Sequence, residues 1–203
     1  MLVDLTTYVS QDSPLLQWAK QQDNPHIAMG HIGTHLDTYE KRPTPLDYLR
    51  SPGVIFDVRG ITEVAVEHIN LDEVEPQSFV LFRTGCMEQH PYGEPGYFER
   101  HPQLSHSLIQ ALVEKGVRFV GVDCPGIRRH EEHEAADRLC ERHGVYVIEN
   151  LANLGQLPRR GLTVYTMWLD DPVMTALKCK VVAEYSGEGA ADANGSLCKQ
   201  TEG

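Results

Sequence analysis

Short apolar runs rich in β-branched residues recur along the chain and predict strands. The two clearest are 54–58 and 79–83, which end at Gly60 and at Thr84-Gly85. The same pattern predicts further strands over 2–5, 117–122, 145–148, 162–168 and 179–185.

Apolar residues spaced three and four apart predict two amphipathic helices, 105–115 and 131–143. Ser105 suits the N-cap of the first helix, and Gly116 suits its end, because glycine readily adopts the left-handed conformation found there. Shorter helical segments are predicted over 15–22, over 46–49 and, as a helix or a turn, over 66–74.

The alternation of strands and helices in the centre of the chain indicates an α/β fold. The long stretch before Ser105 does not suit a simple doubly wound sheet, so we expect a mixed sheet with helices packed on it. At 203 residues, a single compact domain over 1–185 is expected. The polar, Gly- and Ala-rich segment 186–203 predicts a flexible tail. Residues 86–103 predict a long loop, a feature that is usually functional or mobile.

The charge balance argues against partners that are themselves anionic. Acidic residues outnumber basic residues 29 to 18, which gives a formal net charge of −11. The compact basic pairs are Arg128-Arg129 and Arg159-Arg160, too few to neutralise a row of phosphates. We therefore expect no nucleic acid and no membrane as partners. No apolar run approaches the roughly 18 residues needed to span a bilayer.

The five cysteines predict a reducing compartment. Their number is odd and no Cys-x-x-Cys pair occurs, a pattern typical of free thiols in the cytosol. The first residues lack a basic region followed by an apolar stretch, so no signal peptide is expected. Both observations favour a cytoplasmic protein.

Candidate chemistry is concentrated in the segment His31-Ile32-Gly33-Thr34-His35-Leu36-Asp37. Imidazole nitrogens and a carboxylate oxygen suit Zn²⁺, Mn²⁺ or Fe²⁺. Gly33 permits a backbone turn that lets both histidines converge, and His35 and Asp37 share a face if the segment is extended. By spacing alone, a metal site and a polar loop with scattered histidines are about equally supported.

Two further places offer donors. Glu149 follows the predicted strand 145–148, at the end where α/β sheets carry functional groups, although a surface acid is the simpler interpretation. His133 and Asp137 lie four residues apart on the predicted helix 131–143 and therefore on one face, as a chelating pair or as a solvated pair. The neighbouring residues Glu131, Glu132, Glu134 and Glu141 favour a solvated acidic face for most of this helix.

Taken together, these segments resemble the metal-dependent cyclases and hydrolases that include bacterial kynurenine formamidase and isatin hydrolase. The resemblance rests on the order and spacing of five segments: His31 to Asp37, Arg83-Thr84-Gly85, Tyr97-Phe98 with Pro102 to Ser105, Val120 to Asp123, and Glu149 to Leu154. It covers residues 2 to 157 and, more loosely, the chain to 185.

The resemblance implies a swivelling β/β/α fold assembled as a homodimer or higher homo-oligomer. It implies that His31, His35 and Asp37 bind a divalent metal, Zn or Mn, and that Glu149 and a later histidine bind a second ion in binuclear members. Two positions depart from the pattern. Lys41 stands where the family carries its proton-shuttle histidine. Asp137 aligns with the later histidine ligand, and His133 lies one helical turn before it.

The expected activity is hydrolysis of a small-molecule amide, formamide, lactam or ester by a metal-activated water. Asp37 or Glu149 would take the proton of the water, and Lys41 would stabilise the oxyanion or protonate the leaving group. Tyr97 and Phe98, in the segment 86–103, are expected to contact the substrate, with an oligomer contact as the alternative role of that segment. Loss of the shuttle histidine favours a second hypothesis, a catalytically lapsed metal-containing protein that binds a small molecule.

Overall fold

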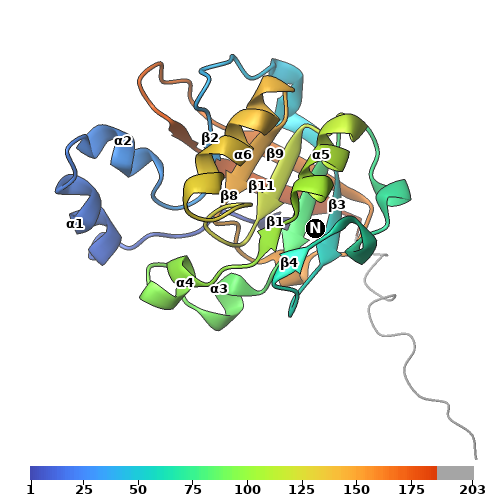
Figure 1. The fold of residues 1–203 in the computed structure, drawn as a ribbon, viewed down its shortest axis with the longest axis horizontal. Helices are drawn as coiled ribbons and strands as arrows, with labels where there is room; N and C mark the ends of the chain where they lie inside the picture. The colour runs from blue at the N-terminus through green and yellow to red at the C-terminus, as the bar shows by residue number, and fades with distance from the viewer. Residues whose placement is uncertain (187–203) are drawn as a thin grey trace, which may run out of the picture.

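The computed structural model describes residues 1–186, which form one mixed α/β domain around a nine-stranded sheet (Figure 1). The strand order is β1-β11-β9-β3-β5-β7-β8-β2-β10. The strands are β1 (Leu2–Asp4), β2 (His35–Asp37), β3 (Arg50–Asp57), β5 (Phe79–Arg83), β7 (Phe119–Val122), β8 (Tyr146–Glu149), β9 (Leu162–Met167), β10 (Ala176–Lys178) and β11 (Lys180–Tyr185). A separate two-stranded sheet joins β4 (Glu63–Val64) to β6 (Gln103–Leu104).

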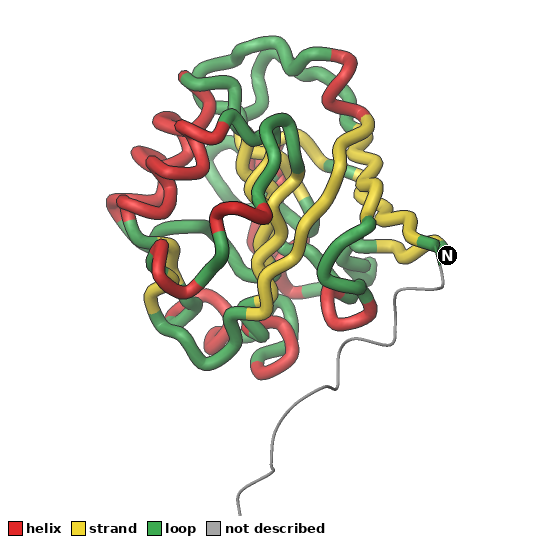
Figure 2. The backbone as a smooth tube through the Cα atoms, turned by 90° about the vertical axis from the view of Figure 1, so that its right-hand side faces the viewer, coloured by secondary structure: helices red, strands yellow, loops and turns green. Residues whose placement is uncertain are grey.

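The centre of the large sheet is parallel and its flanks are antiparallel. Strands β3, β5, β7 and β8 run parallel to one another, whereas β9, β11 and β1 on one side and β2 and β10 on the other pair antiparallel. The central strands are buried on both faces, which explains why they read as continuous apolar runs. The strands twist through the middle of the molecule in Figure 2.

One face of the sheet packs against the two long helices, α5 (His106–Lys115) and α6 (Glu131–Arg142). Side chains such as Val80 and Val120 meet Leu108 and Leu112 of α5 in this layer. The sheet curls, so on its other face the central strands share a second apolar cluster with the flanking strands β9, β10 and β11. The sheet is thus covered on both faces, by helices and by its own curvature.

The two long helices confirm the sequence prediction. Ser105 caps α5, because its Oγ accepts a hydrogen bond from the backbone N–H of Leu108 at 3.2 Å. Gly116 ends the helix with φ of 68°. The predicted strands are likewise present, with ends displaced by one to a few residues.

The sequence missed several short elements. The region before the histidine segment contains α1 (Pro14–Lys20), close to the predicted helix, but also α2 (Pro25–Gly30). The segment 86–103 is not a continuous loop, since it contains α3 (Cys86–Gln89) and α4 (Pro95–Glu99). Strands β2 and β10 were also missed, because each has three residues and is defined by its partner.

The sequence also predicted a helix or a turn over 66–74 and a flexible tail over 186–203. Residues 66–74 form two short 3-10 helices, Val66–His68 and Leu71–Glu73. The tail predicted over 186–203 lies outside the described residues, apart from Ser186. Within 1–186, none of the helices is both long and apolar enough to pass through a bilayer.

Candidate metal centre

Three elements bring the candidate donors together at one edge of the sheet. β2 pairs antiparallel with β8, and His35 lies directly opposite Glu149 in that pairing. Side chains of directly opposed residues project on the same face, so the two groups become neighbours. Helix α6 packs on β8, as Figure 1 shows, and adds His133 and Asp137 from its first two turns. Asp37 ends β2 beside them.

The first group of donors is His31, His35 and Asp37, whose ligand atoms all lie within 4.8 Å of one another. Asp37 Oδ1 lies 3.6 Å from His31 Nδ1 and 3.6 Å from His35 Nε2. The remaining ring nitrogens are engaged elsewhere: His31 Nε2 lies 2.8 Å from Thr175 Oγ1, and His35 Nδ1 lies 2.8 Å from the Gly33 carbonyl oxygen. These outer bonds turn the other nitrogen of each ring toward Asp37, as second partners of metal-binding histidines commonly do.

The second group contains Asp37, His133, Asp137 and Glu149, again within 4.8 Å of one another. His133 Nε2 lies 3.2 Å from Asp137 Oδ2 and 3.3 Å from Glu149 Oε1. The other oxygen of Glu149 lies 3.4 Å from His35 Nε2, so this carboxylate reaches both groups. Asp37 belongs to both.

Most of these donors are buried and have no hydrogen-bond partner within the described chain. The unpartnered atoms are His35 Nε2, both oxygens of Asp37, both oxygens of Asp137, and Glu149 Oε1. Buried polar atoms are nearly always paired, and an unpaired one costs about 1–3 kcal/mol. A cluster of unpaired imidazole and carboxylate donors aimed at common points is the arrangement that a divalent cation satisfies. The residues therefore fit one or two divalent metal ions.

Burial and mutual repulsion perturb the carboxyl groups. Burial, and then the charges of Glu149 and Asp137, raise the pKa of Asp37 well above its ordinary value. Burial and the charge of Glu149 do the same to the pKa of Asp137. Burial alone would raise the pKa of Glu149, but His133 and His35 outweigh it and lower that pKa to about 2. The three carboxyl groups therefore strongly influence one another's ionisation.

His31 behaves as a neutral donor. Burial, and then the charge of His35, lower the pKa of His31 to about 4. A neutral imidazole keeps the lone pair that a metal requires. His31 is thereby available as a ligand at neutral pH.

Asn150 anchors the histidine segment to the end of β8. Its side-chain Nδ2 donates to the Gly33 carbonyl at 3.0 Å, and its backbone carbonyl accepts a hydrogen bond from Thr34 Oγ1 at 2.8 Å. Tyr97 Oη in turn donates to Asn150 Oδ1 at 2.6 Å. Gly33 has φ of +80°, the left-handed turn expected from the sequence. This network was not predicted, although the Glu149-Asn150 sequence was part of the recognised motif.

The prediction of a solvated acidic face on α6 was right for Glu131, Glu132 and Glu134, which are exposed, and wrong for Glu141. Glu141 is buried and accepts hydrogen bonds from Thr38 Oγ1 and from the backbone N–H groups of Glu40 and Arg42. It was missed because a helix surface gives no sign of the loop that will cover it. Its carboxylate fixes the path of the chain immediately after Asp37.

Lys41 lies in the segment 38–42, which Glu141 holds by these hydrogen bonds, and it is outside both groups of donors. Its side chain is exposed, and its Nζ donates to the backbone carbonyl of Val173 at 3.4 Å. Partial burial lowers its pKa, which Glu141 and Asp171 oppose. His130, at the start of α6, is also exposed and belongs to neither group.

Tyr39 is the residue near the centre that the sequence analysis overlooked. Its ring lies 6.4 Å from that of His31, and the Arg138 guanidinium covers it at 5.4 Å. Burial, and then the charges of Asp37, Asp137 and Glu149, raise its pKa, so the phenol remains a hydrogen-bond donor. The available signal was its position two residues after Asp37, which places both on one face of an extended segment.

The two predicted substrate contacts occupy different environments. Tyr97 is fully buried, with its hydroxyl on Asn150, so in this structure it positions the histidine segment and is not open to a substrate. Phe98 is 39% exposed and packs edge-on against Tyr97. Tyr92, from the same segment, accepts a hydrogen bond from the Gly33 N–H at 2.7 Å. Residues 86–103 therefore support the histidine segment directly.

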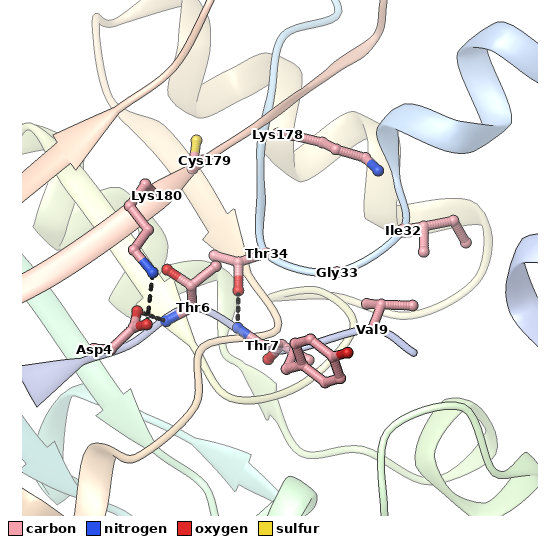
Figure 3. A pocket seen from close by; sticks show the side chains of 11 residues that line it. Asp4, Thr6, Thr7, Val9, Ile32, Gly33, Thr34, Lys178, Cys179 and Lys180 are labelled. Carbon is pink, nitrogen blue, oxygen red and sulfur yellow. Dashed lines mark hydrogen bonds and ion pairs between the residues drawn. The ribbon is translucent and has the colours of Figure 1, made fainter. Parts of the chain in front are cut away.

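A cavity of about 280 Å³ lies against another side of the histidine segment (Figure 3). Its lining includes Thr7, Gly33, Thr34 and Lys180, and none of the clustered donors. Figure 3 shows Thr34 facing Thr7, with the Thr7 N–H donating to Thr34 Oγ1 at 2.8 Å, and Lys180 paired with Asp4. These groups satisfy one another, and none of the clustered donors lines the cavity.

A mixed α/β domain with clustered imidazole and carboxylate donors is the arrangement expected of a protein that binds divalent metal. The chain belongs to the family described as "Putative cyclase", whose profile matches residues 3–129. It is 29% identical over 155 residues to a kynurenine formamidase of Bacillus cereus, covering 67% of this chain and 70% of that protein. A Bacillus thuringiensis kynurenine formamidase is 26% identical over 168 residues, covering 73% and 77%.

Solved structures share the fold at lower identity. Isatin hydrolase A from Ralstonia solanacearum superposes with a TM-score of 0.73 at 19% identity, over 90% of this chain and 91% of that one. A structure described as a potential metal-dependent hydrolase with cyclase activity gives a TM-score of 0.71 at 21% identity, over 90% and 96%. These similarities confirm the resemblance recognised in the sequence and the mixed α/β fold.

Proposed function

We propose that this protein hydrolyses a carbon–nitrogen bond other than a peptide bond in a small molecule, such as an amide, formamide or lactam, or the related ester. The observation that carries the proposal is the convergence of unpartnered, buried donors from β2, β8 and α6. The sequence relatives named kynurenine formamidase support the type of bond. They act on small molecules, in keeping with a small-molecule substrate here.

The metal is a divalent ion, Zn or Mn, and the residues offer places for two. His31, His35 and Asp37 would hold one ion; Asp37, His133, Asp137 and Glu149 would hold the other. When bound, such an ion lowers the pKa of a water molecule toward neutrality and polarises a carbonyl group.

The protein's own groups would move the protons. Glu149 has its pKa lowered by the facing imidazoles and remains ionised, so it can accept a proton from the attacking water. Asp37 is the alternative acceptor. The leaving nitrogen must gain a proton, and two residues that follow Asp37 could donate it. One is Lys41, the predicted donor, and the other is Tyr39, whose pKa is raised by the charges of the clustered carboxylates.

The decisive experiment is a hydrolysis screen of N-formyl aromatics, lactams and lactones with metal-free and metal-loaded protein. We expect turnover that requires added metal and falls by roughly 10²-fold or more in Glu149→Gln. Glu134→Gln is the matched control, because it removes an exposed carboxylate from α6. Turnover that is the same without metal would contradict the proposal.

The second candidate function is a lapsed enzyme that binds a small molecule at the metal. The exposed position of Lys41, bonded to Val173, favours it, because no histidine takes the expected shuttle position. Metal-loaded protein that hydrolyses nothing in the screen, yet binds a substrate analogue by calorimetry, would establish this alternative.

The assembly and location are part of the same proposal. We propose a cytoplasmic homodimer or higher homo-oligomer. Exposed large apolar side chains, among them Tyr8, Leu46 and Leu169 at more than four-fifths exposure, are available for a contact between copies. The free, buried thiols Cys86, Cys124, Cys140 and Cys179 suit a reducing compartment. Light scattering of the purified protein measures the oligomeric state directly.

A further inference from the structure

The two groups of donors differ in chemical composition. The first offers two imidazoles and one carboxylate, whereas the second offers one imidazole and three carboxylates, with Asp37 common to both. The difference is produced by Asp137, which occupies the position where the resemblance expects a histidine. The chain thus places a nitrogen-rich and an oxygen-rich set of donors side by side.

The oxygen-rich set is built into the interior. Asp37, Asp137 and Glu149 are each no more than 3% exposed. Both oxygens of Asp137 and Oε1 of Glu149 have no hydrogen-bond partner within residues 1–186. A surface acidic cluster would be solvated; these carboxylates are withdrawn from water and directed at one another, which only a cation compensates well.

The imidazole of this set is held in place by the backbone. Gly126 has φ of +122°, and a Cβ built on it would lie 2.6 Å from His133 Nδ1 and 2.8 Å from the Arg128 carbonyl oxygen. The absence of a side chain therefore lets the His133 ring approach this turn closely. With Nδ1 against Gly126, Nε2 faces Asp137 and Glu149.

Donor type governs which ion each set prefers. Carboxylate oxygens suit hard ions such as Mg²⁺ and Mn²⁺, whereas imidazole suits Zn²⁺, and geometry and donor type set selectivity more than raw affinity does. One imidazole among three carboxylates fits Mn²⁺ better than Mg²⁺, because Mg²⁺ binds oxygen donors and retains several waters. The advantage of Zn²⁺ over Mn²⁺ should be smaller at the oxygen-rich set.

We propose that the centre sorts its metals, with Zn²⁺ at His31, His35 and Asp37 and Mn²⁺ at Asp37, His133, Asp137 and Glu149. The inference rests on the proposed metal-dependent function and goes beyond it by assigning unlike ions to the two sets. Asp137 is the residue that determines the difference.

The test supplies metal-free, full-length protein with about one equivalent of Zn²⁺ and an excess of Mn²⁺, then removes unbound metal. Sorting gives about one ion of each kind per chain by elemental analysis, and an electron paramagnetic resonance signal of isolated Mn²⁺. Without sorting, random occupancy leaves about a quarter of the molecules with two Mn²⁺ ions, recognised by the broad signal of a spin-coupled pair. A prominent coupled-pair signal overturns the inference.

Two variants and a control complete the test. Asp137→His gives the second set two imidazoles, as in the first, so coupled pairs should appear and bound Mn²⁺ should fall about tenfold relative to Zn²⁺ under competition. Asp137→Asn, which is nearly isosteric, should lose Mn²⁺ and keep Zn²⁺. Glu131→His adds an imidazole to the exposed side of the same helix and should behave like the unmodified protein.

The possible failures are distinguishable. If the unmodified protein binds no divalent metal, the proposed function fails together with the inference. If it binds two ions with no preference, or if Asp137→His and Asp137→Asn leave the preference unchanged, only the inference fails.

Discussion

Replacing Asp137 with asparagine should stabilise the metal-free protein, although the substitution is in the core. Asp137 is 3% exposed, and its oxygens have no hydrogen-bond partner within the described chain. Asparagine keeps the shape, removes the charge and adds a donor that can reach Glu149. Most buried substitutions are destabilising, so an increase in stability is a specific consequence of the clustered carboxylates.

The magnitude follows from the separation of the charges. Donor atoms of Asp37, Asp137 and Glu149 lie within 4.8 Å of one another. Two like charges at that distance repel by about 3.5 kcal/mol at an effective dielectric constant of about 20. Because an acid of raised pKa can take up a proton instead, part of this cost is avoided, and we expect a gain of about 1–3 kcal/mol. For a domain of this size that corresponds to a rise in Tm of about 2–12 °C.

The effect should grow with pH. Burial and like charges raise the folded-state pKa of Asp137 and Asp37, so the folded protein binds protons that the unfolded chain releases. Their contribution to the stability of the folded protein is therefore lost as pH rises above about 4, toward their raised folded-state pKa values. His31, with its pKa lowered to about 4, has the opposite slope between pH 4 and 6.5. Comparison of the variant with the unmodified protein between pH 6.5 and 8 isolates the carboxylates.

The assay is thermal and urea unfolding of chelator-treated protein, repeated with saturating Mn²⁺. Saturating metal should stabilise the unmodified protein more than Asp137→Asn, because metal binding at about a hundredfold excess over Kd adds about 2.7 kcal/mol per site. Glu131→Gln, an exposed charge change in the first turn of α6, should alter stability by less than about 1 kcal/mol. If Asp137→Asn instead loses more than about 1 kcal/mol of stability without metal, the carboxylate is stabilised in the metal-free protein, contrary to this prediction.

Three further changes separate the remaining roles. Lys41→Met should lower turnover by roughly 10²–10⁴-fold with metal content unchanged if Lys41 is the proton donor; unchanged turnover, together with a loss in Tyr39→Phe, would transfer that role to the phenol. Phe98→Ala should raise KM with little effect on kcat if the exposed ring contacts substrate; a change in oligomeric state alone, seen by light scattering, would contradict that role. Gly126→Ala should displace His133 and, by elemental analysis, reduce bound metal to about one ion per chain; two ions bound as before would show that the ring tolerates the shift.

The sequence predicted the central fold because that fold depends on local patterns. Strands β3, β5, β7 and β8 are buried on both faces, so their apolar runs are unmistakable, and helices α5 and α6 carry regular apolar stripes. β2 left no such signal, because three residues that include two candidate metal ligands do not form a pattern. Its identity as a strand comes from pairing with β8 and β10, which are distant in the chain.

Part of the metal centre could be predicted from the sequence for the same reason. His31, His35 and Asp37 lie close in sequence, and Glu149 follows a recognisable strand, so spacing and resemblance were sufficient to nominate them. Whether His133 and Asp137 face solvent or the interior depends on how α6 packs on β8, which their spacing does not encode. Glu141 demonstrates the limit: it is as acidic as its exposed neighbours, and only the loop over 38–42 buries it.

The same fold explains why the clustered carboxylates should lower the stability of the metal-free protein. Flexible side chains would relieve repulsion by turning toward water, but here the backbone fixes the donors. His35 is held by the Gly33 carbonyl, Glu149 by the pairing of β8 with β2, and the chain beyond Asp37 by the buried Glu141. None of these bonds involves a metal. The fold therefore forces the carboxylates together before any ion binds, so neutralising one of them should release free energy that the fold itself has stored.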